Sequence, residues 1–276
     1  GVRAPLPKAD VVMIAADHDS PRTSETGSIL RLFHELGIHV ATSESQRFYF
    51  PNRELAVLAV PGSFAPRPAL VPDPQARYNV LMLHGVIRGI VPEHVVAASP
   101  NSQELTREEL GAGRWSYIAL GDHHVYTEVY PNAYYSGAID YTSLDTWGEL
   151  YEDTAARTKG KGFIEYDLET GYRKFHGPTS SRPLVDLPHI SARGLTASEV
   201  DARIRAAIDK SPGGIDDKIV RVIVRDIPRH IARELDHRAI RDYRRRALHF
   251  QLDTRRPEIV RQHGQAAPGR RPTLAD

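Results

Sequence analysis

The sequence predicts an α/β protein in two parts, and three observations support this. Short apolar segments of β type alternate with polar and helical segments along the chain, as in a sheet covered by helices. Three of these segments end directly in His and Asp residues. Beyond residues 177–183, strand and helix signals alternate more regularly. We therefore expect a larger first domain over 1–181, a smaller α/β domain over 182–257, and a basic tail or linker over 258–276.

The first domain is expected to start with a strand at residues 11–14 and a helix at 24–36. Ile29, Leu32, Phe33 and Leu36 give that helix an apolar stripe, and Gly37 is placed to end it. Residues 61–77 are rich in Pro and predict a surface loop. A short helix is expected near 106–110. Further strands are expected at 38–41, 47–50, 55–60, 78–83, 117–120, 133–140 and 161–167.

The second domain shows a clearer order of elements. A strand is expected at 184–191, and the capping-box residues Thr196 and Glu199 open a helix that buries Val200, Ile204 and Ile208. A strand at 219–225, an Arg-rich helix at about 229–246 and a strand at 248–253 follow. This order of strands and helices predicts a small α/β domain of its own.

Composition excludes several classes of protein. With 41% hydrophobic and 26% charged residues, the chain is neither disordered nor fibrous. No apolar run approaches the roughly 20 residues that a membrane-spanning helix needs, and the N-terminus lacks a secretory pattern. We expect no membrane partner and a cytoplasmic location. Because there is no cysteine, any metal must be held by His, Asp, Glu, Asn or backbone oxygen.

The charge is distributed unevenly. Residues 1–181 carry 16 Lys and Arg against 22 Asp and Glu, a formal charge of −6, whereas 182–276 carry 20 against 13, a charge of +7. A basic segment attached to an acidic body indicates a polyanionic or acidic partner. A solvated Arg-rich helix is the alternative interpretation.

The three His/Asp clusters indicate metal-assisted hydrolysis. They are Asp17-His18-Asp19, His84-Gly85 and Gly121-Asp122-His123-His124. Strand ends hold such side chains at the rim of a sheet, where sites of α/β proteins form. Each His taken alone could instead be a cap or a satisfied surface residue. The order of all three clusters, at three strand ends, favours a site.

In chain order these clusters resemble the last three of five motifs of the calcineurin-type metallophosphoesterases, nearest the SbcD-type DNA repair exonucleases. Ala16-Asp17-His18-Asp19 stands where that family has G-N-H-D, and Ser20-Pro21-Arg22 after it is typical of the exonuclease branch. His84-Gly85 matches the fourth motif, and residues 121–124 stand where G-H-x-H is expected. The segments 135–137 and 161–163 also resemble this branch, and the domain after residue 182 resembles its DNA-capping domain.

The resemblance implies a four-layer αββα sandwich, incomplete at its N-terminus, with a second, smaller α/β capping domain. It implies a metal-dependent phosphodiesterase, a DNA exo- or endonuclease subunit for end processing and double-strand break repair. One divalent metal, Mn²⁺ in the first place and Mg²⁺ or Zn²⁺ as alternatives, would be surrounded by Asp17, His84 and Asp122. His124 would reach a second metal, and His18 would be the general acid.

The implied partners are DNA, an SbcC-like coiled-coil ATPase and, as an alternative assembly, a second copy of the chain. We expect DNA contacts from Arg22, Arg241, Arg244 and Arg245.

The sequence departs from the family in two ways. Asp17 replaces an Asn and Asp122 replaces a His, and the D-x-H and G-D-x-x-D motifs do not precede residue 17. We therefore expect a fragment, a split gene product or a degenerate paralogue. Two alternatives to an active nuclease remain: a catalytically impaired scaffold that binds DNA or docks an ATPase, and a general small-molecule phosphoesterase.

Overall fold

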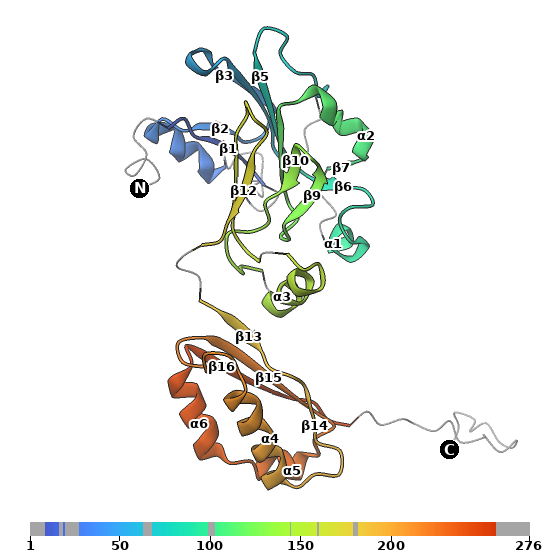
Figure 1. Ribbon diagram of the computed structural model, residues 1–276, viewed down its shortest axis with the longest axis vertical. Helices are drawn as coiled ribbons and strands as arrows, with labels where there is room; N and C mark the ends of the chain where they lie inside the picture. The colour runs from blue at the N-terminus through green and yellow to red at the C-terminus, as the bar shows by residue number, and fades with distance from the viewer. Residues whose placement is uncertain are drawn as a thin grey trace, which may run out of the picture. The chain divides into compact units, whose positions relative to one another are not determined.

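The computed structural model describes residues 9–16, 19, 28–62, 68–98, 103–143, 145–158, 160–178 and 182–257. The chain divides into two compact units, Gly1–Ser181 and Arg182–Asp276, called unit 1 and unit 2 below and described separately (Figure 1). The predicted domain boundary falls at this division. Both units combine sheets with helices, so the general α/β class is confirmed.

Unit 1 is built on a mixed six-stranded sheet. The four central strands are parallel to one another, and an antiparallel strand pairs at each edge. In spatial order the strands are β3 (Gln46–Phe50), β4 (Leu55–Val60), β5 (Tyr78–His84), β8 (Tyr117–Gly121), β10 (Ala133–Tyr135) and β9 (Thr127–Tyr130). Because β5 and β8 are parallel and pair His84 with Gly121, their carboxyl ends lie at the same edge of the sheet.

Three smaller strand pairs accompany this sheet. They are β1 (Val12–Ile14) with β2 (His39–Ala41), β6 (Val86–Ile87) with β7 (Glu104–Leu105), and the hairpin of β11 (Phe163–Tyr166) and β12 (Arg173–His176). The helical segments are the 3-10 helices η2 (Ile29–Leu36), η3 (Pro51–Arg53) and η4 (Ala112–Arg114), and the α-helices α1 (Glu93–Ala98), α2 (Arg107–Leu110) and α3 (Thr146–Ala155).

The core of unit 1 follows from the alternation of side chains along its strands. Leu81 and Leu83 of β5 are fully buried, as is Ile118 of β8 beside them, because every second residue of a strand faces the same side. These residues join Ile87 and Leu105 in one apolar cluster. The cluster fixes β5 and β8, and so it fixes the position of the residues at their ends.

Two sequence predictions for unit 1 were wrong in detail. The segment predicted as one helix is a 3-10 helix over 29–36 where it is described, and Ile29 and Leu32 of its apolar stripe are 68% exposed. In a 3-10 helix every third residue aligns, and here that face points to solvent. The strand predicted at 133–140 ends at Tyr135, since Gly137 takes a left-handed φ of 76° that no strand continues.

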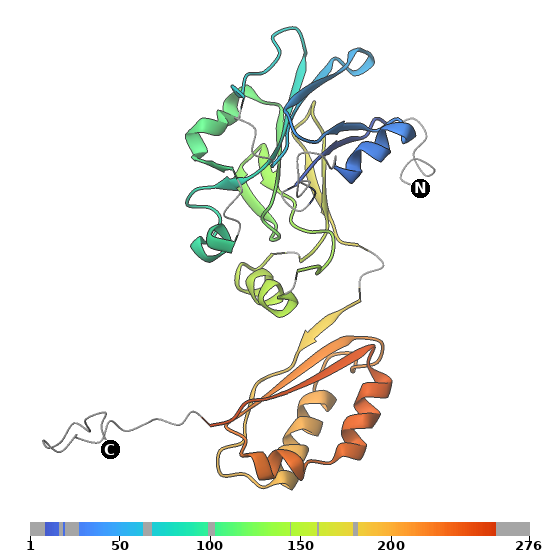
Figure 2. The same ribbon diagram turned by 180° about the vertical axis from the view of Figure 1, so that it is seen from behind.

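Unit 2 has a parallel sheet with β15 (Ile219–Arg225) at its centre (Figures 1 and 2). On one side β15 pairs with β16 (His249–Thr254); on the other it pairs with β13 (Leu184–Asp186) and then β14 (Ile190–Ser191). The single strand predicted at 184–191 is thus divided at Pro188, which has no N–H for the ladder.

The helices of unit 2 are α4 (Ala197–Asp209), α5 (Arg229–Arg233) and α6 (His237–Arg246). Thr196 and Glu199 form the predicted capping box of α4. The predicted Arg-rich helix is two helices, because the side chain of Asp236 accepts hydrogen bonds from Arg238 N and Ala239 N, both 3.0 Å, and begins α6 there.

The core of unit 2 is apolar. Val220, Val222 and Val224 of β15 are fully buried, and Val200 and Ile204 of α4 are at most 1% exposed. These residues belong to one cluster. The predicted apolar faces of α4 and β15 are confirmed. None of the helices in the described part of the chain has the length and apolar character that a membrane span requires.

Candidate functional site

The ends of β5 and β8 bring two predicted site residues together. His84 is the last residue of β5, and Asp122 follows directly after Gly121, the last residue of β8. A Cβ atom built on Gly121 would lie 3.1 Å from His84 Nδ1. Gly121 therefore leaves the space in which the His84 imidazole lies, and Asp122 is the next residue along that edge.

Asp122 has an unfavourable backbone conformation and an unfavourable side-chain environment. Its φ of 101° lies in the left-handed region, which costs a non-Gly residue on the order of 1–3 kcal/mol. Its Oδ2 atom is buried and has no hydrogen-bond partner among the described residues. A buried acceptor without a donor is costly as well. A cation or a hydrogen-bond donor at Oδ2 would relieve this second cost.

Tyr135 of β10 fixes the turn after His84. Its hydroxyl donates to Gly85 O at 2.8 Å and accepts from Ile87 N at 3.0 Å. The side chain is fully buried, and burial raises the pKa of the phenol, so it remains a donor at neutral pH. The turn at His84-Gly85 is thereby tied to a strand two positions away in the sheet.

His123 is buried and packs against an aromatic ring. It is 7% exposed, and its ring meets the ring of Tyr135 edge-on with centroids 5.5 Å apart. Burial lowers the pKa of His123 to about 4, because a charged imidazolium is poorly solvated there. His123 is therefore neutral near pH 7 and packs beside the residue that fixes the His84 turn.

His124 is paired with a carboxylate. Its Nδ1 atom contacts Glu149 Oε1 on α3. This hydrogen bond raises the pKa of His124. For Glu149, burial favours a higher pKa, but the His124 hydrogen bond and the charge of Lys161 outweigh it and lower the pKa. Both shifts favour the charged forms of the pair. His124 Nδ1 is committed to Glu149, and Nε2 is left for other contacts.

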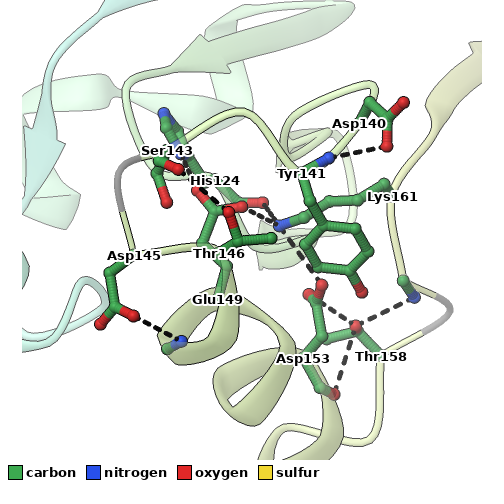
Figure 3. Close-up of polar contacts among 12 residues, drawn as sticks. His124, Asp140, Tyr141, Ser143, Asp145, Thr146, Glu149, Asp153, Thr158 and Lys161 are labelled. Carbon is green, nitrogen blue, oxygen red and sulfur yellow. Dashed lines mark hydrogen bonds and ion pairs between the residues drawn. The ribbon is translucent and has the colours of Figure 1, made fainter. Parts of the chain in front are cut away.

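Lys161 lies at the centre of a charge cluster, which we define as His124, Glu149, Asp153 and Lys161 (Figure 3). Glu149, Asp153 and Lys161 are buried, whereas the His124 side chain is 46% exposed. The Lys161 side chain is 2% exposed, and Nζ lies 3.3 Å from both Glu149 Oε2 and Asp153 Oδ2. Nζ also donates to His124 O at 2.7 Å. One ammonium thus holds α3, through its two carboxylates, against the backbone of His124.

Tyr141 and Thr158 enclose the cluster. The Tyr141 ring lies 4.8 Å from Lys161 Nζ, and Figure 3 shows it beside Lys161 and Asp153. Burial, with the nearby Asp153 charge, raises the pKa of Tyr141. Thr158 Oγ1 donates to Asp153 Oδ1 at 3.1 Å. Glu149 Oε2 and Asp153 Oδ2 lie within ion-pair distance of Lys161 but are buried without a hydrogen-bond partner among the described residues. The cluster is therefore a costly arrangement, because a buried ion pair needs additional hydrogen bonds to offset its desolvation.

The structure places the predicted site residues in different positions. His84 and Asp122 lie at the same edge of the sheet, at the ends of β5 and β8, whereas His124 Nδ1 contacts Glu149. Asp17, His18 and Arg22 lie outside the described residues. Within the described part of the chain, no three His, Asp or Glu side chains are grouped as a metal would require.

The predicted site residues include none of Tyr135, Glu149, Asp153 and Lys161. Tyr135 and Lys161 lie in the segments 135–137 and 161–163, whose resemblance to the exonuclease branch was the available signal. For Glu149 and Asp153 the signal was their four-residue spacing, which places both carboxylates on one face of a helix.

The predicted DNA-binding arginines of unit 2 separate into two kinds. Arg241 and Arg244 line a hollow of about 380 Å³ next to β16. Arg245 is paired with Asp242 on the same helix. The three arginines are thus not equivalent.

Comparison with protein-family models and with curated protein sequences gives no match to this chain.

Proposed function

We propose that unit 1 is a metal-dependent phosphodiesterase domain of the nuclease type, with the four-layer αββα sandwich of the calcineurin-type enzymes, and that it acts on DNA ends. The observation that carries the proposal is the adjacency of His84 and Asp122 at the ends of two parallel strands, with Asp122 Oδ2 buried and unsatisfied among the described residues. An imidazole and a carboxylate at one sheet edge are the donor types that phosphoesterase metals take.

These residues fit a divalent cation. Asp122 Oδ2 is an acceptor that lacks a donor, and Gly121 leaves room for the His84 ring. His84 and Asp122 would hold the metal, with Asp17 as the third ligand implied by the family resemblance. When bound, Mn²⁺, or Mg²⁺ or Zn²⁺ in its place, supplies a hydroxide near neutral pH and stabilises negative charge on phosphate.

The residues of the chain itself would position and protonate the substrate. His124 is held by Glu149 through Nδ1, and its raised pKa keeps Nε2 protonated over a wider pH range. A protonated Nε2 can donate to a phosphate oxygen. His18 is the proposed general acid for the leaving oxygen. Unit 2 is proposed as the DNA-capping domain, and an SbcC-like ATPase as the partner.

The test is metal binding together with DNA cleavage by the full chain. We expect calorimetric titration with Mn²⁺ to detect binding, and linear duplex or single-stranded DNA to be cleaved when Mn²⁺ is present. Asp122→Asn and His84→Gln should each weaken Mn²⁺ binding at least about tenfold. His189→Gln, an exposed His in unit 2, is the matched control and should bind as the parent does. Absence of both binding and cleavage would refute the proposal.

A second candidate function is a non-catalytic scaffold of the same fold. It is favoured by the commitment of His124 Nδ1 to Glu149, which makes this nitrogen unavailable to a metal. This candidate predicts DNA binding without Mn²⁺ binding and without cleavage. Two tight Mn²⁺ sites in the same titration would exclude it.

A further inference from the structure

A groove lies along one edge of unit 2, between α6 and β16. It consists of two hollows of about 380 and 410 Å³ that share Arg244 and Leu252. Leu235, Ile240 and Leu252 give the first hollow an apolar lining. The second includes Leu248, which is 53% exposed. The groove thus follows β16 and offers apolar contacts along its length.

The strand beside the groove has an unpaired edge among the described strands. β16 pairs with β15 on one side and with no other described strand. His249 N donates to Lys218 O and Arg255 N donates to Val224 O, so the odd-numbered residues direct their backbone groups toward β15. Since this direction alternates along a strand in a parallel ladder, the N–H and C=O groups of Phe250, Leu252 and Thr254 face the open edge.

The charge at the groove is positive. Among the described residues, no carboxylate lies within ion-pair distance of Arg241 or Arg244, whereas Arg245 pairs with Asp242 and Arg246 with Asp216. On the helical wheel, Arg241 and Arg244 share a face with Ile240, which lines the groove with them. Two guanidiniums that have no counter-charge within the described part of the chain therefore line an apolar groove.

We propose that this groove binds an extended acidic segment of a partner protein, which adds to β16 as a further strand. Its backbone would pair with Phe250, Leu252 and Thr254. Alternate side chains would fill the apolar hollows, and its carboxylates would bind Arg241 and Arg244. A DNA backbone would use the two guanidiniums, but neither the apolar lining nor the open strand edge. The protein ligand accounts for all three features.

The test uses a fluorescein-labelled peptide of alternating Glu and Val and the full chain, with binding followed by fluorescence anisotropy. We expect the double variant Arg241→Gln/Arg244→Gln to weaken binding at least about tenfold. Arg238→Gln is the matched control, because Arg238 lies on α6 but does not line the groove, and it should leave binding unchanged. A peptide with Lys in place of Glu should bind much more weakly.

A second measurement separates strand addition from simple charge attraction, and it needs no variant of the protein. The same acidic peptide with N-methylated alternate residues keeps its charge but loses the backbone donors. Methylation can be placed on either of the two alternating sets of residues. The peptide methylated on the set that faces β16 should bind much more weakly. Equal binding of both methylated forms, or undiminished binding to the double variant, would overturn the proposal.

Two further results would replace the proposed ligand by another. Displacement of the peptide by duplex DNA, with Arg238→Gln weakening DNA binding as much as the groove variants do, would favour a general DNA surface. A dimer in sedimentation that the acidic peptide dissociates would make a second copy of the chain the occupant.

Discussion

The two units differ in where they place their charged residues. Unit 1 buries His123, Glu149, Asp153 and Lys161, whereas Ser211 is the one buried polar residue among those described in unit 2. Buried ion pairs contribute little to stability when compared with apolar packing. The core of unit 2 is therefore built for stability, and its charged side chains lie on the surface. Unit 1 concentrates costly groups around His124, next to the predicted metal edge, as functional sites do.

The largest expected effect comes from breaking the charge cluster around Lys161. Lys161→Met leaves the carboxylates of Glu149 and Asp153 buried without their cation, and we expect unit 1 to lose about 3–5 kcal/mol of unfolding free energy. Tryptophan fluorescence in urea measures this, because both tryptophans, Trp115 and Trp147, lie in unit 1. Lys174→Met, at an exposed lysine of β12, is the control. A loss no larger than that of the control would contradict the role given to Lys161.

The next effect depends on pH and involves His123. Its pKa is 6.5 when unperturbed and about 4 in the folded chain, so the unfolded state binds more protons between these values. The contribution of neutral His123 to the unfolding free energy of unit 1 is fully present above about pH 6.5. It is lost as the pH falls toward 4, by at most about 3 kcal/mol. His124, whose pKa is raised, already makes its full contribution below pH 6.5 and does not cancel this loss.

Tryptophan fluorescence at a series of pH values measures the slope between pH 6.5 and 4.5, above the usual range of carboxylate titration. His123→Leu should remove most of the slope, and His189→Gln in unit 2 should retain it. A slope that persists in His123→Leu would assign the effect to other groups.

A smaller effect is expected in unit 2, where a surface cap rather than a buried charge is removed. Thr196→Ala deletes the hydroxyl that accepts from Glu199 N, which should cost about 1 kcal/mol. Hydrogen–deuterium exchange of the peptides that cover α4 measures it as faster exchange in the first turn. Ser198→Ala, in the same turn but not the cap, should exchange as the parent does.

The smallest effect is expected for the Arg246–Asp216 pair of unit 2. Both guanidinium contacts are 3.0 Å, but the side chains are 47% and 59% exposed. Exposed ion pairs contribute little because water screens them. Arg246→Gln should therefore change the unfolding of unit 2 less than Thr196→Ala does. A larger loss would show that surface charge matters in unit 2 as buried charge does in unit 1.

The strands were largely predictable from the sequence, and the most important helix of the site was not. The alternation around Leu81 and Leu83 indicates β5, and the parallel ends of β5 and β8 place His84 near Asp122. Helix α3 escaped prediction because its buried residues are Glu149 and Asp153, which an apolar pattern does not detect. The partner of His124 therefore lies 25 residues along the chain, where no motif marks it.

Other errors have local causes. Pro188 interrupts a strand that hydrophobicity alone makes continuous, and Asp236 begins a new helix inside an Arg-rich segment. The exposure of Ile29 and Leu32 shows that an apolar stripe does not by itself specify burial. Local backbone and cap chemistry explains the errors at Pro188 and Asp236. The exposure of Ile29 and Leu32 depends instead on packing partners that are remote in sequence.

The double hydrogen bond of Tyr135 has a consequence for motion. Its hydroxyl joins Gly85 O and Ile87 N, so the turn that carries His84 moves together with a strand from the interior of the sheet. Restricting that turn lowers the entropy that His84 must lose when it binds a ligand. The phenol oxygen of Tyr135 thus restricts the motion of the His84 turn. Its removal would lower the affinity for a ligand of His84 without changing any group that touches the ligand.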